Sequence, residues 1–445
     1  MSDLVNVLDG VRRSTLNALR VRRGSPPPRS RLAPAPTRVP EPEWTTPDPR
    51  PLPEAGTVVG RVGFDDTRTL PPGFATLTVH RHGEDGFRLT GFAPGVRIFG
   101  SEPTDNATVA RYAPARLSAD ELVEHHSAAR PVEIIADFNT WSRGHGRNAL
   151  RSWLNEVRIR QPDLHLIIAD STNLAIPWEA FRLAEPPHPG DALAAGWLGA
   201  VLPVTRWTPS FAEKVDRAAG SLNSRPACEG GVVGYFARDL RSTVVDRQIL
   251  KGFLAGEPHE DGDAFIAALR TSVPPGGKPP AMVYVGAHYQ HDDDPTRRFI
   301  GPFQLARMNF YEELPLISDG RTIIFLNVCR SAEMSTVPGR GDDSLYGMPD
   351  FFLRKGAAGL IGTTSKVGAG TAPDVLADLL REAADAPQTP IPQLLRRLRE
   401  RADKDAGPLV DQKDRALVWR WIDTFNYVYY GHPLATFRLV SQHGP

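Results

Sequence analysis

The sequence has few cysteines and no long apolar run. Only Cys228 and Cys329 occur in its 445 residues, which excludes a disulfide framework and a cysteine-rich zinc site. No apolar stretch approaches the roughly 18 residues that a membrane-spanning helix needs. The N-terminus, MSDLVNVLDGVRRSTLNALRVRR, has neither a continuous apolar stretch nor a small-residue cleavage site, so a secretory signal is not expected. These absences predict a cytoplasmic protein.

The chain also lacks an excess of charge of either sign. Lys+Arg and Asp+Glu both number 52, and the formal net charge is zero, so no nucleic-acid partner is expected. The sequence contains no GxSxG elbow and no HExxH motif, and GTTSKVGAG (362–370) lacks the GxxxxGK[ST] spacing of a phosphate loop. We therefore expect no cofactor, and a nucleotide-binding module is a weak third hypothesis for the function.

The N-terminal third divides into three segments of different composition. Residues 1–24 contain an amphipathic helix with a basic C-terminal half, which predicts a tether and leaves membrane-surface contact by 3–23 as an alternative. Residues 25–55 are rich in proline, which blocks helix and sheet hydrogen bonding and indicates a disordered linker. Residues 56–115 contain short β-like runs between turn signals and predict a small β-rich section.

The rest of the chain alternates strand and helix patterns. In 116–230 we expect a capped helix from Ser118, a strand PVEIIADF, a helix near 147–160 and a buried strand LHLIIAD. In 231–445 the strands GVVGYFA, PAMVYVGA, RTIIFLNV and AAGLIGT precede helices near 243–255, 303–314, 347–355 and 372–384, and the strands FNYVYY and ATFRLV close the chain. Continuous apolar strands, each followed by a helix, predict a parallel sheet covered on both faces.

Two reactive residues stand where neighbouring strands of this sheet end. His288 follows MVYVGA and Cys329 follows TIIFLNV. Ligands of open parallel sheets bind beyond the carboxyl ends of the strands, and adjacent strands lie about 4.8 Å apart. An imidazole beside a thiol favours the reactive thiolate. On spacing alone, a small buried cysteine and a loop histidine are the favoured interpretations of these residues, ahead of a catalytic pair.

Several segments resemble CHAT domains, which are relatives of caspases and separases. The resemblance is carried by VYVGAHYQ, IIFLNVCRSAE and FFLRKGAAGLIGTTSKVG, with LAIPWEAFRL before them and YVYYGHPLATFRL after them. The five matches occur in the family's order and cover roughly residues 116–445. The resemblance implies a caspase-like α/β/α sandwich with a mostly parallel central sheet, residues 231–445 being its catalytic core and 116–230 an accessory or pseudo-caspase-like part.

The resemblance also implies site residues and a chemistry. His288 and Cys329 match the catalytic dyad of a cysteine endopeptidase, and the N–H groups of Tyr289 and Cys329 match its oxyanion hole. Tyr289 stands where the family has glycine, and His432 replaces the aspartate of the closing Gly-Asp-Pro turn.

Other residues are weaker candidates for a part in the site. Candidates for substrate binding are Arg238 and Asp239 after the first core strand and Asn327 before the cysteine; each could equally be solvated. The acidic cluster His291–Asp294 could hold Ca²⁺ but more simply forms a solvated loop, and no metal site is predicted. Asp342 and Asp343 mark either a specificity loop or an ordinary surface turn. In IPWEA, Trp178 and Glu179 are interpreted as a packed aromatic and a buried, hydrogen-bonded carboxylate.

Two functions from different classes remain open. The first is an active endopeptidase in a regulated bacterial defence or cell-death system, with a protein substrate and an activating partner protein. The second is a catalytically inactive interaction scaffold that keeps the fold, which the tyrosine after His288 favours.

Overall fold

A computed structural model describes residues 70–82, 86–100, 108–109, 131–144, 147–172, 175–183, 195–208, 222, 224–274, 277–290, 298–304, 313–336, 345–408 and 414–441. The expected N-terminal helix, the proline-rich linker and the helix from Ser118 lie outside these residues. In the part of the chain that is described, no helix combines the length and the apolar character needed to cross a membrane.

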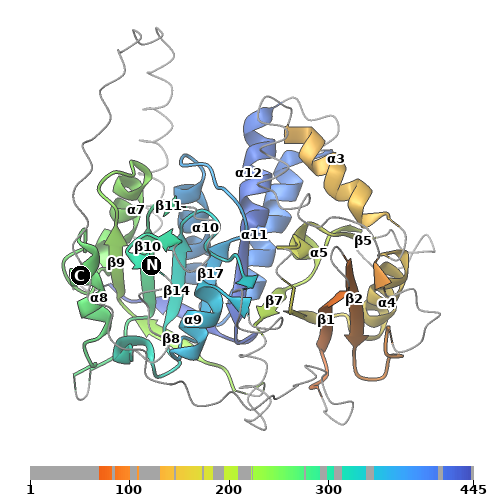
Figure 1. Cartoon of the computed structure of the whole chain (residues 1–445), viewed down its shortest axis with the longest axis horizontal. Helices are drawn as coiled ribbons and strands as arrows, with labels where there is room; N and C mark the ends of the chain where they lie inside the picture. Colours follow the sequence, from red (N-terminus) through yellow and green to blue (C-terminus); the bar gives the residue numbers. More distant parts are fainter. Residues whose placement is uncertain are drawn as a thin grey trace, which may run out of the picture.

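A ten-stranded, mostly parallel sheet runs through the molecule, with β1 and β9 near its opposite ends (Figure 1). Its strands, in spatial order, are β3 (Thr108–Val109), β2 (Gly86–Phe92), β1 (Phe74–His82), β4 (His165–Asp170), β7 (Val204–Trp207), β18 (Tyr427–Gly431), β17 (Gly359–Thr363), β14 (Ile323–Asn327), β10 (Met282–Gly286) and β9 (Val232–Phe236). β18 runs antiparallel to β17 and parallel to β7, so this strand joins the two halves of the sheet.

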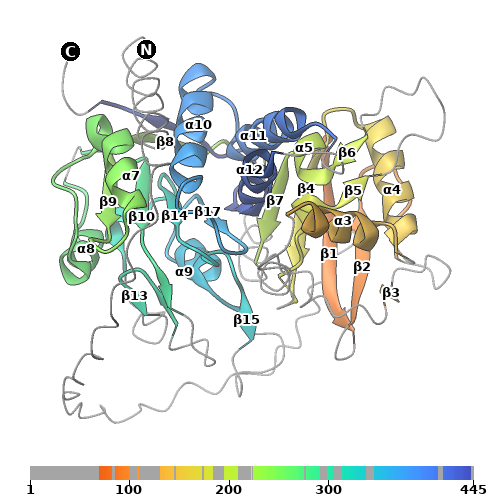
Figure 2. The ribbon, with the colours of Figure 1, turned by 90° about the horizontal axis from the view of Figure 1, so that it is seen from above.

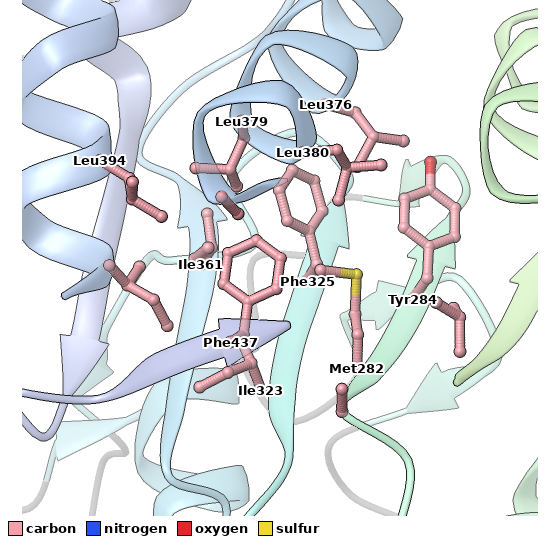
Figure 3. Packing of buried hydrophobic residues seen from close by; sticks show 14 of the residues in the cluster. Met282, Tyr284, Ile323, Phe325, Ile361, Leu376, Leu379, Leu380, Leu394 and Phe437 are labelled. Carbon is pink, nitrogen blue, oxygen red and sulfur yellow. The ribbon is translucent and has the colours of Figure 1, made fainter. Parts of the chain in front are cut away.

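Helices cover both faces of the C-terminal half, which gives the α/β/α sandwich that was predicted. α7 (Ser242–Leu250), α10 (Ala372–Asp385) and α11 (Ile391–Ala406) pack on one face, against Met282, Tyr284, Ile323 and Phe325. Figure 3 shows this packing. α8 (Gly262–Leu269) and α9 (Met348–Arg354) cover the other face, and Figure 2 shows α9 and α10 on opposite sides of β14 and β17.

The N-terminal half of the sheet has its own apolar cluster. α4 (Arg147–Arg160) packs on Leu77, Leu166 and Ile168. α3 (Pro131–Ser142), the short α5 (Leu198–Val201) and α12 (Arg415–Asn426) form another cluster, with Trp197 against Trp421 at its centre. α12 therefore belongs to the C-terminal sequence but packs against the N-terminal half.

Short elements complete the fold. The remaining strands form small sheets: β5 (Arg182–Leu183) with β6 (Gly196–Trp197), β8 (Ala227–Gly230) with β19 (Thr436–Leu439), β15 (Ser335–Thr336) with β16 (Leu345–Tyr346), and β11 (Tyr289–Gln290) with β12 (Phe299–Ile300) and β13 (Phe303–Gln304). The 3-10 turns are η3 (Trp178–Ala180), η5 (Lys251–Phe253) and η7 (Pro315–Ile317).

The β-like runs before residue 115 supply β1, β2 and β3, which join the main sheet. Two expectations about these elements need correction. PVEIIADF is helical, since Ile134, Ile135, Phe138 and Trp141 fall on one buried helix face despite the β-branched residues. Residues 303 and 304, where a helix was expected to begin, form β13, which makes a hairpin with β12. Gly301 in the turn of this hairpin has a φ of 59°, which favours glycine. Residues 305–312 of the expected helix lie outside the described part of the chain.

Candidate active site

His288 and Cys329 lie at the same level beyond two neighbouring parallel strands. β10 pairs with β14 in a register that runs from Met282 opposite Ile323 to Gly286 opposite Asn327. Each pair is separated by 41 residues, which is also the separation of His288 and Cys329. Both residues stand two positions beyond the end of their strand. The sheet therefore delivers the imidazole and the thiol to one edge.

The alternation of side chains predicts one face of the sheet for both residues. Tyr284 and Phe325 belong to the apolar cluster under α7 and α10. Ala287 and Val328 belong to the cluster on the opposite face, so the alternation continues one residue past each strand. Extending it by one more residue predicts that His288 and Cys329 return to the Tyr284 face. The His288 side chain is exposed and Cys329 is half-buried, so solvent reaches both.

The turn after Cys329 is fixed on the end of β17. Arg330 has a φ of 54°, a left-handed conformation that is uncommon for a residue other than glycine. The N–H of Arg330 donates to Ser365 O at 3.1 Å, and the N–H of Ala332 donates to Thr363 O at 2.9 Å. The Thr363 hydroxyl donates to Val328 O at 2.7 Å. Such a conformation persists when its surroundings determine it, as they do here on the C-terminal side of the thiol.

The residue after His288 begins a small β-ribbon. Tyr289 stands opposite Ile300 in the β11–β12 pair, and Gly301 N–H donates to His288 O at 3.1 Å. This bond makes Tyr289 and Ile300 a non-hydrogen-bonded pair, so the N–H of Tyr289 points away from β12. The orientation matters because the N–H of Tyr289 was predicted to face a substrate oxygen.

A buried polar network lies directly beneath the two residues. Tyr284 Oη donates to Asp246 Oδ2 at 2.6 Å, and Asn327 Nδ2 donates to the same oxygen at 3.2 Å. Tyr427 Oη donates to Asn327 Oδ1. Asp246 Oδ1 is buried without a hydrogen-bond partner. Burial raises the pKa of Asp246 to about 7, against the effect of its hydrogen bonds to Tyr284 and Asn327.

The network also couples to Cys329. Burial raises the pKa of Tyr427 well above its ordinary value, and negative charge on Asp246, Asp423 and Cys329 raises it further. Tyr427 is therefore electrostatically linked to both the buried carboxyl and the thiol.

The second cysteine, Cys228, is less accessible than Cys329 and has a raised thiol pKa. Cys228 lies in β8 with no exposed surface, and burial, with a smaller effect of Asp319, raises the pKa of its thiol to about 12. Because the thiolate is the nucleophile, Cys228 is unreactive near neutral pH. Cys329 is thus the thiol that an external electrophile can reach.

The candidates for substrate binding occupy different environments. Asn327 is buried, and its amide is engaged in the network of Asp246, Tyr284 and Tyr427. Arg238 and Asp239 are exposed, and Arg238 pairs with Glu260 at 2.7 Å. A substrate role for these three residues stays a prediction. Residues 291–294, 342 and 343 lie outside the described part of the chain.

The IPWEA segment has the structural role that was predicted. Trp178 is buried and its Nε1 donates to Asp170 Oδ2 at 3.0 Å. Glu179 is buried against Arg206 of β7, whose Nε donates to Glu179 Oε1 at 3.0 Å. His432, in the closing turn, is also buried, and its backbone N–H donates to Ala358 O at 3.0 Å.

Sequence reasoning missed the supporting residues of the site. Asp246 lies in the middle of α7, and Arg298 and Glu333 follow the two reactive residues at unequal distances. No motif marks them, because their connection to the site arises only when the strands pair. The sequence pattern could have indicated only Asp246. It lies on the buried face of α7, between Thr243 and Ile249, where a carboxylate is unusual.

Comparison with known proteins finds similarity of structure only. No family model matches the chain, and no curated protein does so. Two structures of the Saccharomyces cerevisiae separase–securin complex match at 11% and 14% identity, with TM-scores of 0.44 and 0.38, over 82% and 65% of this chain. The chain spans 30% and 17% of those two separase chains. Gingipain R, an Arg-specific cysteine proteinase, matches at 12% identity and a TM-score of 0.38, over 66% of this chain and 69% of its own.

Proposed function

We propose that this chain is a cysteine endopeptidase of the CHAT type, in which Cys329 is the nucleophile and His288 the general acid and base. One observation carries the proposal: the β10–β14 register brings an imidazole and an accessible thiol to the same level on adjacent strands. Groups placed this way can act on one carbonyl held between them.

The proposed reaction is acyl transfer to the thiol. Cys329 loses its proton to His288, and its sulfur attacks the carbonyl carbon of a peptide bond. The N–H groups of Cys329 and Tyr289 stabilise the oxyanion. His288 then gives the proton to the leaving amine, a thioester forms, and water attacks the thioester to release the acid and restore the thiol.

The surroundings of Cys329 favour this role over a structural one. A structural cysteine is buried and inert, as Cys228 is with its raised thiol pKa. Cys329 instead stands half-exposed before a left-handed residue, in a turn fixed by four hydrogen bonds to and around β17. Strained backbone of this kind clusters at sites of chemistry.

The proposal includes a regulated role with a protein substrate and an activating partner protein. Resemblance to the CHAT family supports this part, and a bacterial defence or cell-death system is the proposed setting. The proposal does not specify which side chain the substrate carries at the cleaved bond.

Cleavage of a peptide library tests the activity. The protein is incubated with a digest of a bacterial proteome, and new termini are identified by mass spectrometry. We expect termini that appear with the wild type and disappear with both Cys329→Ala and His288→Ala, at least 100-fold below wild type since each residue is essential to the same step. Termini that persist in Cys329→Ala would assign the cleavage to a contaminant. No cleavage with or without proteins encoded beside this chain would favour the scaffold.

A further inference from the structure

We propose that Tyr289, Arg298 and Glu333 form a clip that holds the segment bearing His288 against the turn bearing Cys329. The inference rests on the proposed function, because it assigns these three side chains as positioning residues of the same site. It also gives a role to the tyrosine that stands where the CHAT pattern has glycine.

Arg298 links the chain after His288 to the chain after Cys329. Its Nη1 donates to Glu333 Oε1 at 3.0 Å and to Ser335 Oγ at 2.9 Å. Arg298 leads into β12, which pairs with β11 directly after His288. The N–H of Glu333 donates to Arg330 O at 3.0 Å, so Glu333 is part of the turn that contains Cys329.

The ion pair is shielded from water more than the Arg247–Glu260 pair on the surface of the same protein. The Arg298 and Glu333 side chains are 13% and 24% exposed, whereas those of Arg247 and Glu260 are 44% and 31% exposed. Exposed pairs hold their geometry weakly, while partly desolvated charge-assisted bonds hold it better. Of these two pairs, only that of Arg298 connects the two reactive segments.

We assign Tyr289 as the third member of the clip from its position. It directly follows His288 and begins β11, which pairs with the strand that Arg298 leads into. The pKa of Tyr289 is raised to about 12, chiefly by burial, with charge on Glu333 acting in the same direction and Arg298 opposing it. The clip thus acts next to His288 itself.

The expected consequence concerns the thiol of Cys329. An imidazole lowers a thiol pKa only when the two groups are close, and a shift of about 1 Å between reacting groups can cost about 100-fold in rate. Without the clip, the strand ends still align, but the segments beyond them lose the connection that Arg298 makes to Glu333 and Ser335. Cys329 should then behave as an ordinary thiol.

The test measures the rate of Cys329 alkylation by iodoacetamide from pH 5 to 10, followed by intact mass. The wild type should react at pH 6.5 about tenfold faster than His288→Ala, because His288 favours the thiolate.

Arg298→Ala and Glu333→Ala should each approach the His288→Ala profile, and the double variant should be no slower than either. Tyr289→Phe, which removes only the hydroxyl, should shift the profile in the same direction by less. Charge reversal in Arg298→Glu with Glu333→Arg should restore part of the rate.

Arg160→Ala is the matched control, since it breaks a 3.2 Å salt bridge with Glu156 on α4, in the N-terminal half of the molecule, and it should keep the wild-type profile. A wild-type profile in Arg298→Ala, with a shifted profile in His288→Ala, would overturn the clip and leave the dyad standing. Identical profiles in wild type and His288→Ala would overturn the dyad and the clip together. Unfolding midpoints identify variants that fail to fold. If the Arg298 and Glu333 variants do not fold, the alkylation profile of Tyr289→Phe tests the clip.

Discussion

At the scale of single residues, the burial of Asp246 has the clearest measurable effect on the free energy of unfolding. Its side chain is fully buried, its two donors come from Tyr284 and Asn327, and the pKa of its carboxyl is about 7 instead of 3.8. Between these two values the folded protein keeps a proton that the unfolded chain has released. Raising the pH through this range therefore lowers the free energy of unfolding.

Asp246→Asn should remove this dependence, because asparagine has the shape of the protonated carboxyl and does not titrate. The variant should gain stability relative to wild type as the pH rises from 5 to 8, by up to about 2 kcal/mol. Urea unfolding at both pH values measures the difference. A stability difference that is the same at pH 5 and pH 8 would contradict a raised carboxyl pKa.

The residues of the site differ in how far the sequence could predict them. His288 and Cys329 each follow a continuous apolar strand, so their places beyond strand ends could be predicted. Asp246, Arg298 and Glu333 could not, because their contacts depend on the packing of α7 and on the path of the β-ribbon. A sequence pattern reports which face of an element is buried, but it does not report which polar groups meet there.

At the scale of elements, η3 and β7 are joined by one buried ion pair. The pKa of Glu179 is lowered: burial alone would raise it, and Arg206 outweighs that effect. Arg206 also donates to Ile176 O at 2.9 Å, and its strand pairs with β18. The pair therefore fixes the IPWEA segment beside the strand that joins the two halves.

Glu179→Ala should cost about 3–5 kcal/mol of unfolding free energy at pH 7, because it leaves Arg206 buried without its counter-charge. Replacing Glu179 with Gln keeps the shape of the side chain and one acceptor oxygen for Arg206, and should cost less. Since the folded pKa of Glu179 is below its ordinary value, the wild-type advantage should shrink as the pH falls through that lower pKa. Thermal and urea unfolding of both variants check this, and equal stability of Glu179→Ala and wild type would rule the pair out as a stabilising element.

The elements of the core were largely predictable, and the exceptions have physical causes. The helix at 147–160 and the strands β4, β9, β10, β14 and β17 lie where apolar periodicity indicated. Val132, Ile134 and Ile135 favour a strand by residue type where α3 forms, whereas burial follows the helical period. The expected start of a helix at 303 is β13 because Gly301 turns the chain into a hairpin, and this turn depends on the conformation of a single residue.

At the scale of the whole molecule, the sheet makes the two halves one hydrogen-bonded unit. β18 is bonded to β17 on one side and to β7 on the other, and α12 packs against α3. The division of the chain near residues 115 and 230 remains a prediction, although the strands on either side of those positions share the sheet.

A shared sheet predicts one cooperative unfolding transition. Ile168→Ala in the N-terminal half and Phe325→Ala in the C-terminal half are both buried substitutions, expected to cost about 2–5 kcal/mol each. Each should lower the midpoint of the same transition seen by circular dichroism and by tryptophan fluorescence. Two transitions, only one of which responds to each variant, would show that the halves unfold independently.

The central claim is that His288 and Cys329 act on one bond, and covalent labelling tests it most directly. The protein is treated with a set of peptidyl acyloxymethyl ketones that differ in the terminal side chain, and the modified residue is located by mass spectrometry. The account predicts modification of Cys329 alone, at least tenfold slower in His288→Ala, absent in Cys329→Ala and absent after denaturation. Labelling of Cys329 at the same rate in wild type, His288→Ala and denatured protein would contradict it.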